Sequence, residues 1–192
     1  PGQFDRELAT SLLAHAHSQA VGGDTVGALA TGREALDLWQ RLDEASSSFE
    51  PQLGNILFAV SVYLSQLGNA QAARSVAEDA VRFWRKASAM DPSKRISLAE
   101  ALQLLSACYT QTRMWRQSLT SEREAIAIRR ELFAAGVAEA DKAFAKRLDK
   151  FVRSLLALGE TDEAIMVARE AADQWRGLAA GDPVGSGAGH VA

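Results

Sequence analysis

The strongest constraint on the fold of this chain is an internal repeat with a period of about 45 residues. Five alignment columns keep one register along the sequence, at successive steps of 45, 45 and 46 residues. They are an alanine column (Ala35, Ala80, Ala125, Ala171), a small-residue column (Ala28, Ala73, Ser118, Ala164), a leucine column (Leu12, Leu57, Leu102, Leu148), a second apolar column (Leu8, Leu53, Leu98, Phe144) and a turn column (Gly23, Gly68, Arg113, Gly159). A repeat of this length predicts supersecondary units that stack on their neighbours.

Each repeat has the pattern of two helices joined by a tight turn. In the second repeat, Leu53, Leu57 and Leu64 lie on one face of a helix that Gly68 ends. A second helix follows at once and stops before Pro92, since proline cannot continue an α-helix. The pattern predicts an all-α chain of about eight helices in four antiparallel pairs.

Two turn segments resemble those of tetratricopeptide repeats (TPRs). They are Leu67-Gly68-Asn69, followed by Ala73 and Glu78-Asp79-Ala80, and Leu158-Gly159-Glu160, followed by Ala164 and Arg169-Glu170-Ala171. The period exceeds the usual TPR length of about 34 residues. It is similar to the long-repeat variant of kinesin-light-chain-like proteins and bacterial signalling arrays, in which the second helices are extended. The resemblance implies a right-handed α-solenoid of four TPR-like antiparallel helix pairs, in which the first helix of each pair lines a concave groove.

The predicted boundaries place one repeat domain at 1–183 and a flexible glycine-rich tail at 184–192. The four units are expected at about 4–48, 49–93, 94–138 and 139–183. Arg113 occupies a turn position where the other repeats have glycine, so we expect a strained or reshaped turn there. Because the chain opens on Pro1-Gly2 without a methionine, we expect it to derive from a longer protein.

Charge and composition argue against several classes of partner. The net charge is −3, which gives no general attraction to nucleic acid or to anionic membranes. No apolar run is long enough to span a bilayer. The single cysteine, Cys108, fits a reducing compartment, and we expect a cytoplasmic protein with neither nucleic-acid nor membrane partners. The excess of arginine and alanine is typical of a GC-rich bacterial genome.

No group of residues predicts catalysis, a cofactor or a metal. His15 and His17 are two residues apart on a helix, so their side chains diverge and cannot chelate one ion. No nucleophile with its base and no phosphate-binding glycine loop is present, which predicts that the protein is not an enzyme. Cys108 is expected to be a core thiol, and the tryptophans Trp39, Trp84 and Trp175 are expected to pack in the core.

Helical phase indicates which first-helix residues would face the groove. They are Asn55, Phe58, Val62 and Gln66 in the second repeat, Glu100, Gln103, Ala107 and Gln111 in the third, and Lys146, Asp149 and Arg153 in the fourth. Phe58 and Val62 lie off the buried stripe of their helix, so we expect them to be exposed and to bind a partner. Scattered surface apolarity is the alternative interpretation.

A basic stripe follows the last predicted first helix. Lys142, Lys146, Lys150 and Arg153 recur at three- and four-residue steps and therefore share one helical face. If this face lines the groove, it would attract an acidic segment or a carboxylate. The alternative is an ordinary solvated face.

These observations favour an interaction scaffold that binds a peptide, a helix or a neighbouring domain, as the regulatory or sensor part of a larger bacterial protein. The alternative is homo-oligomerisation through uncapped terminal repeats, because an open solenoid has unsealed ends. A third reading, an enzyme or small-molecule receptor, would require a buried polar pocket.

Overall fold

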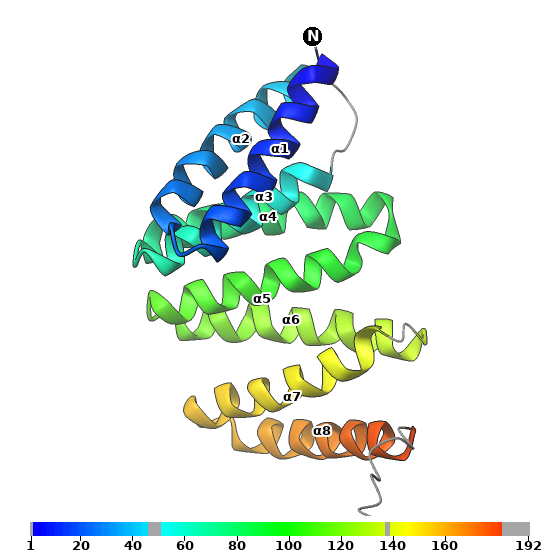
Figure 1. Ribbon diagram of the computed structural model, residues 1–192. Coiled ribbons are helices and arrows are strands. Elements are labelled where there is room, and N and C mark those ends of the chain that lie inside the picture. The colour runs from blue at the N-terminus through cyan, green and yellow to red at the C-terminus, as the bar shows by residue number, and fades with distance from the viewer. Residues whose placement is uncertain (1, 46–50, 137–138, 182–192) are drawn as a thin grey trace, which may run out of the picture. The chain divides into compact units, whose positions relative to one another are not determined.

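A computed structural model describes residues 2–45, 51–136 and 139–181, and every regular element in these ranges is helical (Figure 1). The α-helices are α1 (Gly2–Val21), α2 (Thr25–Ala45), α3 (Pro51–Gln66), α4 (Ala70–Met90), α5 (Arg95–Gln111), α6 (Trp115–Ala134), α7 (Glu139–Ala157) and α8 (Thr161–Gly181), and a short 3-10 helix, η1 (Pro92–Lys94), precedes α5. The predicted all-α architecture is confirmed for these ranges. The expected tail at 184–192 lies outside the described residues.

The predicted repeat is present in the helix boundaries. The second helices of the four pairs begin at Thr25, Ala70, Trp115 and Thr161, which are 45, 45 and 46 residues apart. They contain 21, 21, 20 and 21 residues, whereas the first helices contain 20, 16, 17 and 19. Each second helix is therefore the longer member of its pair, as the period predicts.

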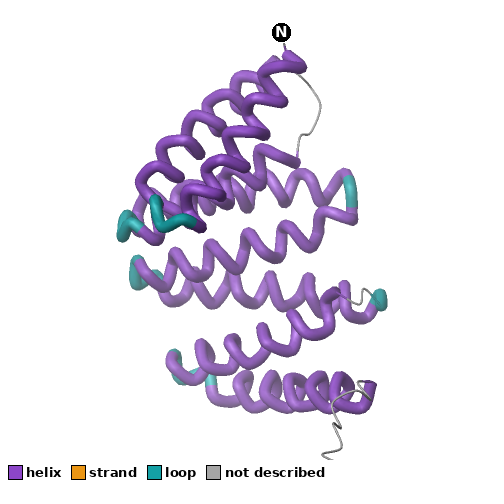
Figure 2. Tube along the Cα trace, in the orientation of Figure 1, coloured by secondary structure: helices purple, strands orange, loops and turns teal. Residues whose placement is uncertain are grey.

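The four turns within the pairs, coloured teal in Figure 2, join antiparallel helices. They share one hydrogen-bond pattern. In each, a backbone N–H bonds a carbonyl five residues earlier: Asp24 to Gln19, Asn69 to Leu64, Met114 to Tyr109 and Glu160 to Leu155. This is the six-to-one bond of a Schellman motif, which requires a left-handed residue just before the donor. Gly23, Gly68 and Gly159 fill that position with φ of 89°, 77° and 78°. Arg113 fills it in the third turn with φ of 60°, so the turn is kept at a conformational cost and is not reshaped.

The helices form two compact units, Pro1–Ser121 and Glu122–Ala192, which are described separately. In the first unit, α1 packs on α2 and α3 packs on α4. Between the pairs, α2 contacts α3 and α4 contacts α5. The helices of a pair meet at small buried side chains, Ala28 and Ala35 on α2 and Ala73 and Ala80 on α4. Because alanine keeps the backbones close, these columns set the spacing of each pair.

Large side chains fill the rest of the first core. Trp39 and Trp84 are 2% and 3% exposed, which confirms their predicted place in the core. Gly54 is buried on α3, and a Cβ there would lie 2.5 Å from Cε2 of Trp84, so only glycine admits the indole. Cys108 is a buried free thiol 3.8 Å from the Ser61 hydroxyl. Leu8 is 51% exposed, although Leu53 and Leu98 in its column are buried.

The second unit contains most of α6 with α7 and α8. Its core consists of one apolar face of α7, packed against small and branched side chains of α8 and against Phe133 of α6. The core residues of α7 are Phe144, Leu148, Phe151 and Leu155, and those of α8 are Ala164, Val167 and Ala171. Trp175 is half-buried, and its indole N–H donates to Asp149 Oδ2 at 2.8 Å. This bond ties the end of α8 to α7.

The left-handed turn column generates a stability prediction. Arg113→Gly should raise the free energy of unfolding by about 1 kcal/mol, because glycine adopts positive φ without the steric cost that a Cβ brings. Gly68→Ala should lower it by about the same amount. A Cβ at Gly68 would meet nothing within 4 Å, so the loss would be conformational and not steric. Urea unfolding measures both, and a stabilising Gly68→Ala would contradict the interpretation.

Candidate functional site

The groove residues predicted in the first unit divide by exposure. Asn55, Gln66, Glu100 and Gln111 are exposed, whereas Phe58, Val62, Gln103 and Ala107 are half-buried. Phe58 and Val62 are therefore less exposed than we expected. Val62 packs against a buried cluster of Ala16, Ala28 and Tyr63, which accounts for its apolar side chain by packing.

One of these polar residues joins neighbouring pairs. Gln111 on α5 donates through Nε2 to the Ser65 hydroxyl of α3 at 2.8 Å. Its Oε1 is 3.0 Å from the same hydroxyl. The side chain of Gln111 is thus committed to a contact between α3 and α5, while Asn55 and Glu100 present polar groups to solvent.

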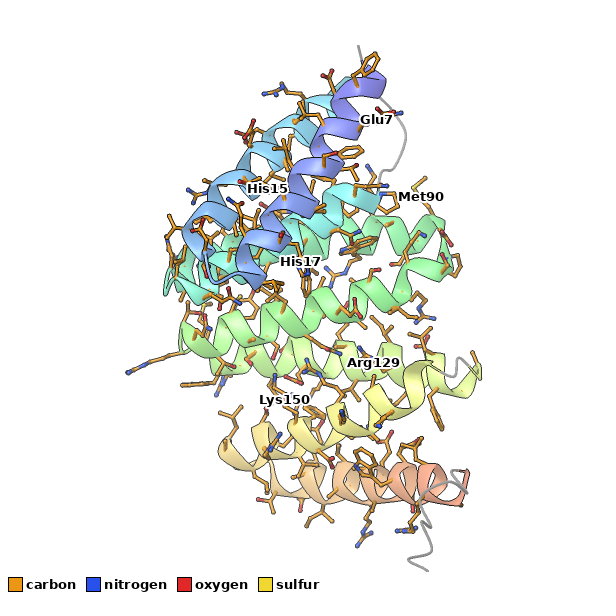
Figure 3. The ribbon with its side chains drawn as sticks, in the orientation of Figure 1. Glu7, His15, His17, Met90, Arg129 and Lys150 are labelled. Atoms are coloured by element: carbon orange, nitrogen blue, oxygen red, sulfur yellow. The ribbon has the colours of Figure 1, made fainter. Side chains whose placement is uncertain are left out.

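In the second unit, the predicted basic stripe is an exposed face of α7. Lys142, Lys146, Lys150 and Arg153 are all exposed, and Figure 3 labels Lys150 on this helix. Within the described residues none of the four pairs with a carboxylate. Surface arginines of α6 behave differently, since Arg123 pairs with Glu163 and Arg130 pairs with Glu170 at 2.7 Å. Asp149, on the same helix, accepts the Trp175 indole N–H and forms no ion pair with the stripe in the described residues.

The basic stripe is unfavourable for the isolated helix. Like charges four residues apart destabilise a helix by about 0.2–0.5 kcal/mol per pair. Lys142, Lys146 and Lys150 make two such pairs, and Asp149, three residues after Lys146, offsets only part of that cost. The helix therefore keeps a charge arrangement that its own stability does not favour.

Sequence reasoning missed a buried charged cluster next to this face. Glu122 and Arg129 of α6 and Arg147 of α7 are all buried, and Arg147 Nε is 3.0 Å from Glu122 Oε1. A comparison of each position with the same position one repeat earlier could have identified these three residues. The corresponding positions one repeat earlier hold Ala77, Trp84 and Ala101, all core residues. A charge in a column that is otherwise apolar marks a buried polar site.

The cluster carries an excess of positive charge, two guanidinium groups for one carboxylate. Burial lowers the pKa of Arg147, the Glu122 carboxylate raises it, and the neighbouring Arg129 lowers it further. Arg147 Nη2 is buried without a hydrogen-bond partner. Glu122 is therefore the carboxylate that offsets the charge of the buried Arg147 guanidinium.

The described residues offer no grouping of three or more histidine, cysteine or acidic side chains that could hold a metal ion. His15 and His17 are both exposed on α1, where Figure 3 labels them. Burial raises the pKa of the Cys108 thiol, which keeps it neutral and unreactive. No helix in the described ranges is long and apolar enough to cross a bilayer.

Comparison with known proteins relates this chain to helical-repeat structures. No protein-family model and no curated protein sequence matches it. The structure is similar to BtubC (BKLC) from P. vanneervenii, with a TM-score of 0.76 and 14% identity over 96% of this chain and 70% of that protein. It is also similar to a Rap protein complexed with competence and sporulation factor, with a TM-score of 0.65 and 14% identity over 89% of this chain and 44% of that one. TPR-like repeats of a putative kinesin light chain from Podospora anserina give a TM-score of 0.55 and 14% identity, over 88% and 95%.

These similarities establish the fold. The chain has a TPR-type helical-repeat fold, that of an α-solenoid, as its sequence resemblance implied. It spans less than half the length of the Rap protein that it matches.

The buried cluster generates the second prediction. Glu122→Gln should lower the free energy of unfolding by about 3–5 kcal/mol, because it leaves the buried Arg147 guanidinium without its carboxylate. Glu163→Gln, which breaks a more exposed pair with Arg123, should cost less than about 1 kcal/mol. Urea unfolding compares the two. The double substitution Glu122→Ala with Arg147→Ala introduces the alanines found one repeat earlier, and it should lower the free energy of unfolding less than Glu122→Gln does. Equal losses for Glu122→Gln and Glu163→Gln would refute the argument.

Proposed function

We propose that this protein is an interaction scaffold whose basic stripe on α7 binds an acidic segment of a protein or peptide partner. The observation that carries the proposal is the set of four exposed cations, Lys142, Lys146, Lys150 and Arg153, which lack an acidic partner in the described residues. Their mutual repulsion is relieved when an anionic segment binds along the helix.

The comparisons are consistent with a binding role. The Rap protein of similar fold is complexed with a competence and sporulation factor. Helical repeats present long surfaces on which a peptide or a helix can lie. For the first unit, we propose that the polar surface of α3 and α5, with Asn55, Gln66 and Glu100 exposed and Phe58, Val62 and Gln103 half-buried, contacts a partner as well.

The proposal assigns no catalytic role to any residue. It places the protein in the bacterial cytoplasm, as a regulatory part of a larger protein. A buried free thiol at Cys108 and the absence of a membrane-spanning helix from the described residues are compatible with that setting.

The basic stripe is tested by charge reversal. Lys146→Glu, Lys150→Glu and Arg153→Glu together should weaken binding of a fluorescent octaglutamate peptide by about tenfold or more, because attraction becomes repulsion. Binding to the unmodified protein should also weaken between about 50 mM and about 300 mM salt. Fluorescence anisotropy measures both effects.

The matched control replaces three exposed arginines outside α7, Arg33, Arg41 and Arg82, by glutamate. The net charge therefore changes by the same amount. It should leave binding within about twofold of the unmodified protein, since these side chains lie on α2 and α4 and not on the helix along which the peptide binds. Equal losses in the two triple variants would show that net charge, and not the α7 face, governs binding.

A second function, self-association, is favoured by exposed apolar side chains in the second unit. Ile165 and Met166 on α8 are 48% and 64% exposed, and Leu156 and Leu158 near the preceding turn are also exposed. Such side chains are suited to packing against a second copy of the chain. If this function operates, light scattering should show a mass that rises with concentration, and Ile165→Glu should abolish the rise. A mass that stays monomeric at all concentrations would exclude it.

A further inference from the structure

An open polar cavity lies in the first unit, outside the surfaces discussed above. Its volume is about 510 Å³, within the roughly 300–1,000 Å³ typical of small-molecule sites. Three helices supply its lining: Arg6, Glu7, Thr10 and Ser11 from α1, Trp39 from α2 and Gln52 from α3. Figure 3 labels Glu7 on the first turns of α1. The lining therefore offers a cation, an anion, two hydroxyls, an indole N–H and a carboxamide.

Three of these side chains hold a buried polar atom that makes no hydrogen bond, namely Nε of Arg6, Nε1 of Trp39 and Oε1 of Gln52. Trp39 is only 2% exposed, and its buried indole Nε1 has no hydrogen-bond acceptor. Oε1 of Gln52 is likewise buried and without a donor. Buried polar groups are nearly always paired, because an unpaired one costs about 1–3 kcal/mol. Two donor atoms, Arg6 Nε and Trp39 Nε1, and one acceptor atom, Gln52 Oε1, are thus without a hydrogen bond at a single cavity.

The fourth repeat shows what the first one lacks. Trp175 occupies the same column as Trp39, and its indole N–H donates to the Asp149 carboxylate at 2.8 Å. In the first repeat the position of Asp149 is taken by Leu13, which has no acceptor. The indole of Trp39 therefore lacks the carboxylate that satisfies its counterpart.

We propose that this cavity binds a free α-amino acid. The ligand carboxylate would take the place of the missing aspartate, accepting from the Trp39 indole N–H beside the positive charge of Arg6. Its ammonium group would donate to Gln52 Oε1 beside the negative charge of Glu7. A zwitterion matches this lining because it carries both the acceptor and the donor that are missing, together with two compensating charges.

The proposal does not depend on the basic stripe of α7, which lies in the other unit. A variant carrying Lys146→Glu, Lys150→Glu and Arg153→Glu should bind amino acids as the unmodified protein does. Loss of peptide binding at α7 and loss of amino-acid binding at Trp39 are thus separately measurable.

The test follows the indole ¹H–¹⁵N resonance of Trp39 by NMR, assigned by its absence from Trp39→Phe. The probes are glycine, an equimolar mixture of the standard amino acids, acetate, methylammonium and N-acetylglycinamide. We expect a saturable shift of the Trp39 resonance with the mixture and with at least one amino acid of it. Acetate and methylammonium, which each supply half of the zwitterion, should bind at least about tenfold more weakly. The exposed Trp115 indole serves as the internal reference.

Variants place the binding in the cavity. Calorimetry should show about a tenfold loss of affinity for the best amino acid in Trp39→Phe, which removes the indole N–H, and no change in Trp175→Phe. Ser11→Trp fills the cavity from an exposed position on α1, keeps Trp39 intact and should abolish the shift. This variant decides the matter if Trp39→Phe fails to fold, as circular dichroism would show.

Three results would overturn the proposal. The first is a Trp39 indole resonance that does not shift with any amino acid up to about 50 mM, which corresponds to a binding free energy weaker than about 2 kcal/mol. Another is an equal affinity for acetate, which would make the cavity a simple anion site. The third is an equal affinity for N-acetylglycinamide, which would assign the cavity to an uncharged peptide group.

Discussion

The close approach of the paired helices at their alanine columns is the constraint on which the rest of the structure depends. Ala28 and Ala35 on α2, and Ala73 and Ala80 on α4, are fully buried, and each places only a methyl group in the space between helices. At that distance the connecting turn must reverse the chain in very few residues, and the left-handed Schellman position achieves this. The turn is therefore required even where the sequence supplies arginine, and Arg113 adopts φ of 60°. Packing between helices overrides the local preference of the residue.

Much of the fold could be predicted from the sequence because the repeat displays each structural constraint four times. A glycine or alanine at one position means little, but the same residue type at four positions in one register identifies a turn or a helix contact. The starts of the second helices and the left-handed turn residues follow this register. The burial of Trp39 and Trp84 also follows from it.

The candidate site was less predictable because exposure depends on which neighbour covers a face. Helical phase places Val62 off the main stripe of α3, but a cluster built from α1, α2 and α3 covers it. The basic stripe of α7 could be predicted, since it needs only the phase of a single helix. The buried Glu122–Arg147 pair could not be predicted from a single helix, because its charges differ only from the apolar residues at the same positions one repeat earlier. The cavity at Trp39 brings together residues from three helices, which no single helical pattern can show.

The one irregular step of the repeat has a consequence for how such a chain can vary. The columns advance by 45 residues up to Arg129 and by 46 from Phe144 onward, so one residue has been inserted between these two positions. An extra residue inside a helix would rotate everything after it by about 100° and turn the buried face outward. The buried faces of α7 and α8 keep their register, so the extra residue lies between Arg129 of α6 and Phe144 of α7, where one pair ends and the next begins. Length changes should thus collect at the joints between pairs, while the turns within pairs keep a fixed length.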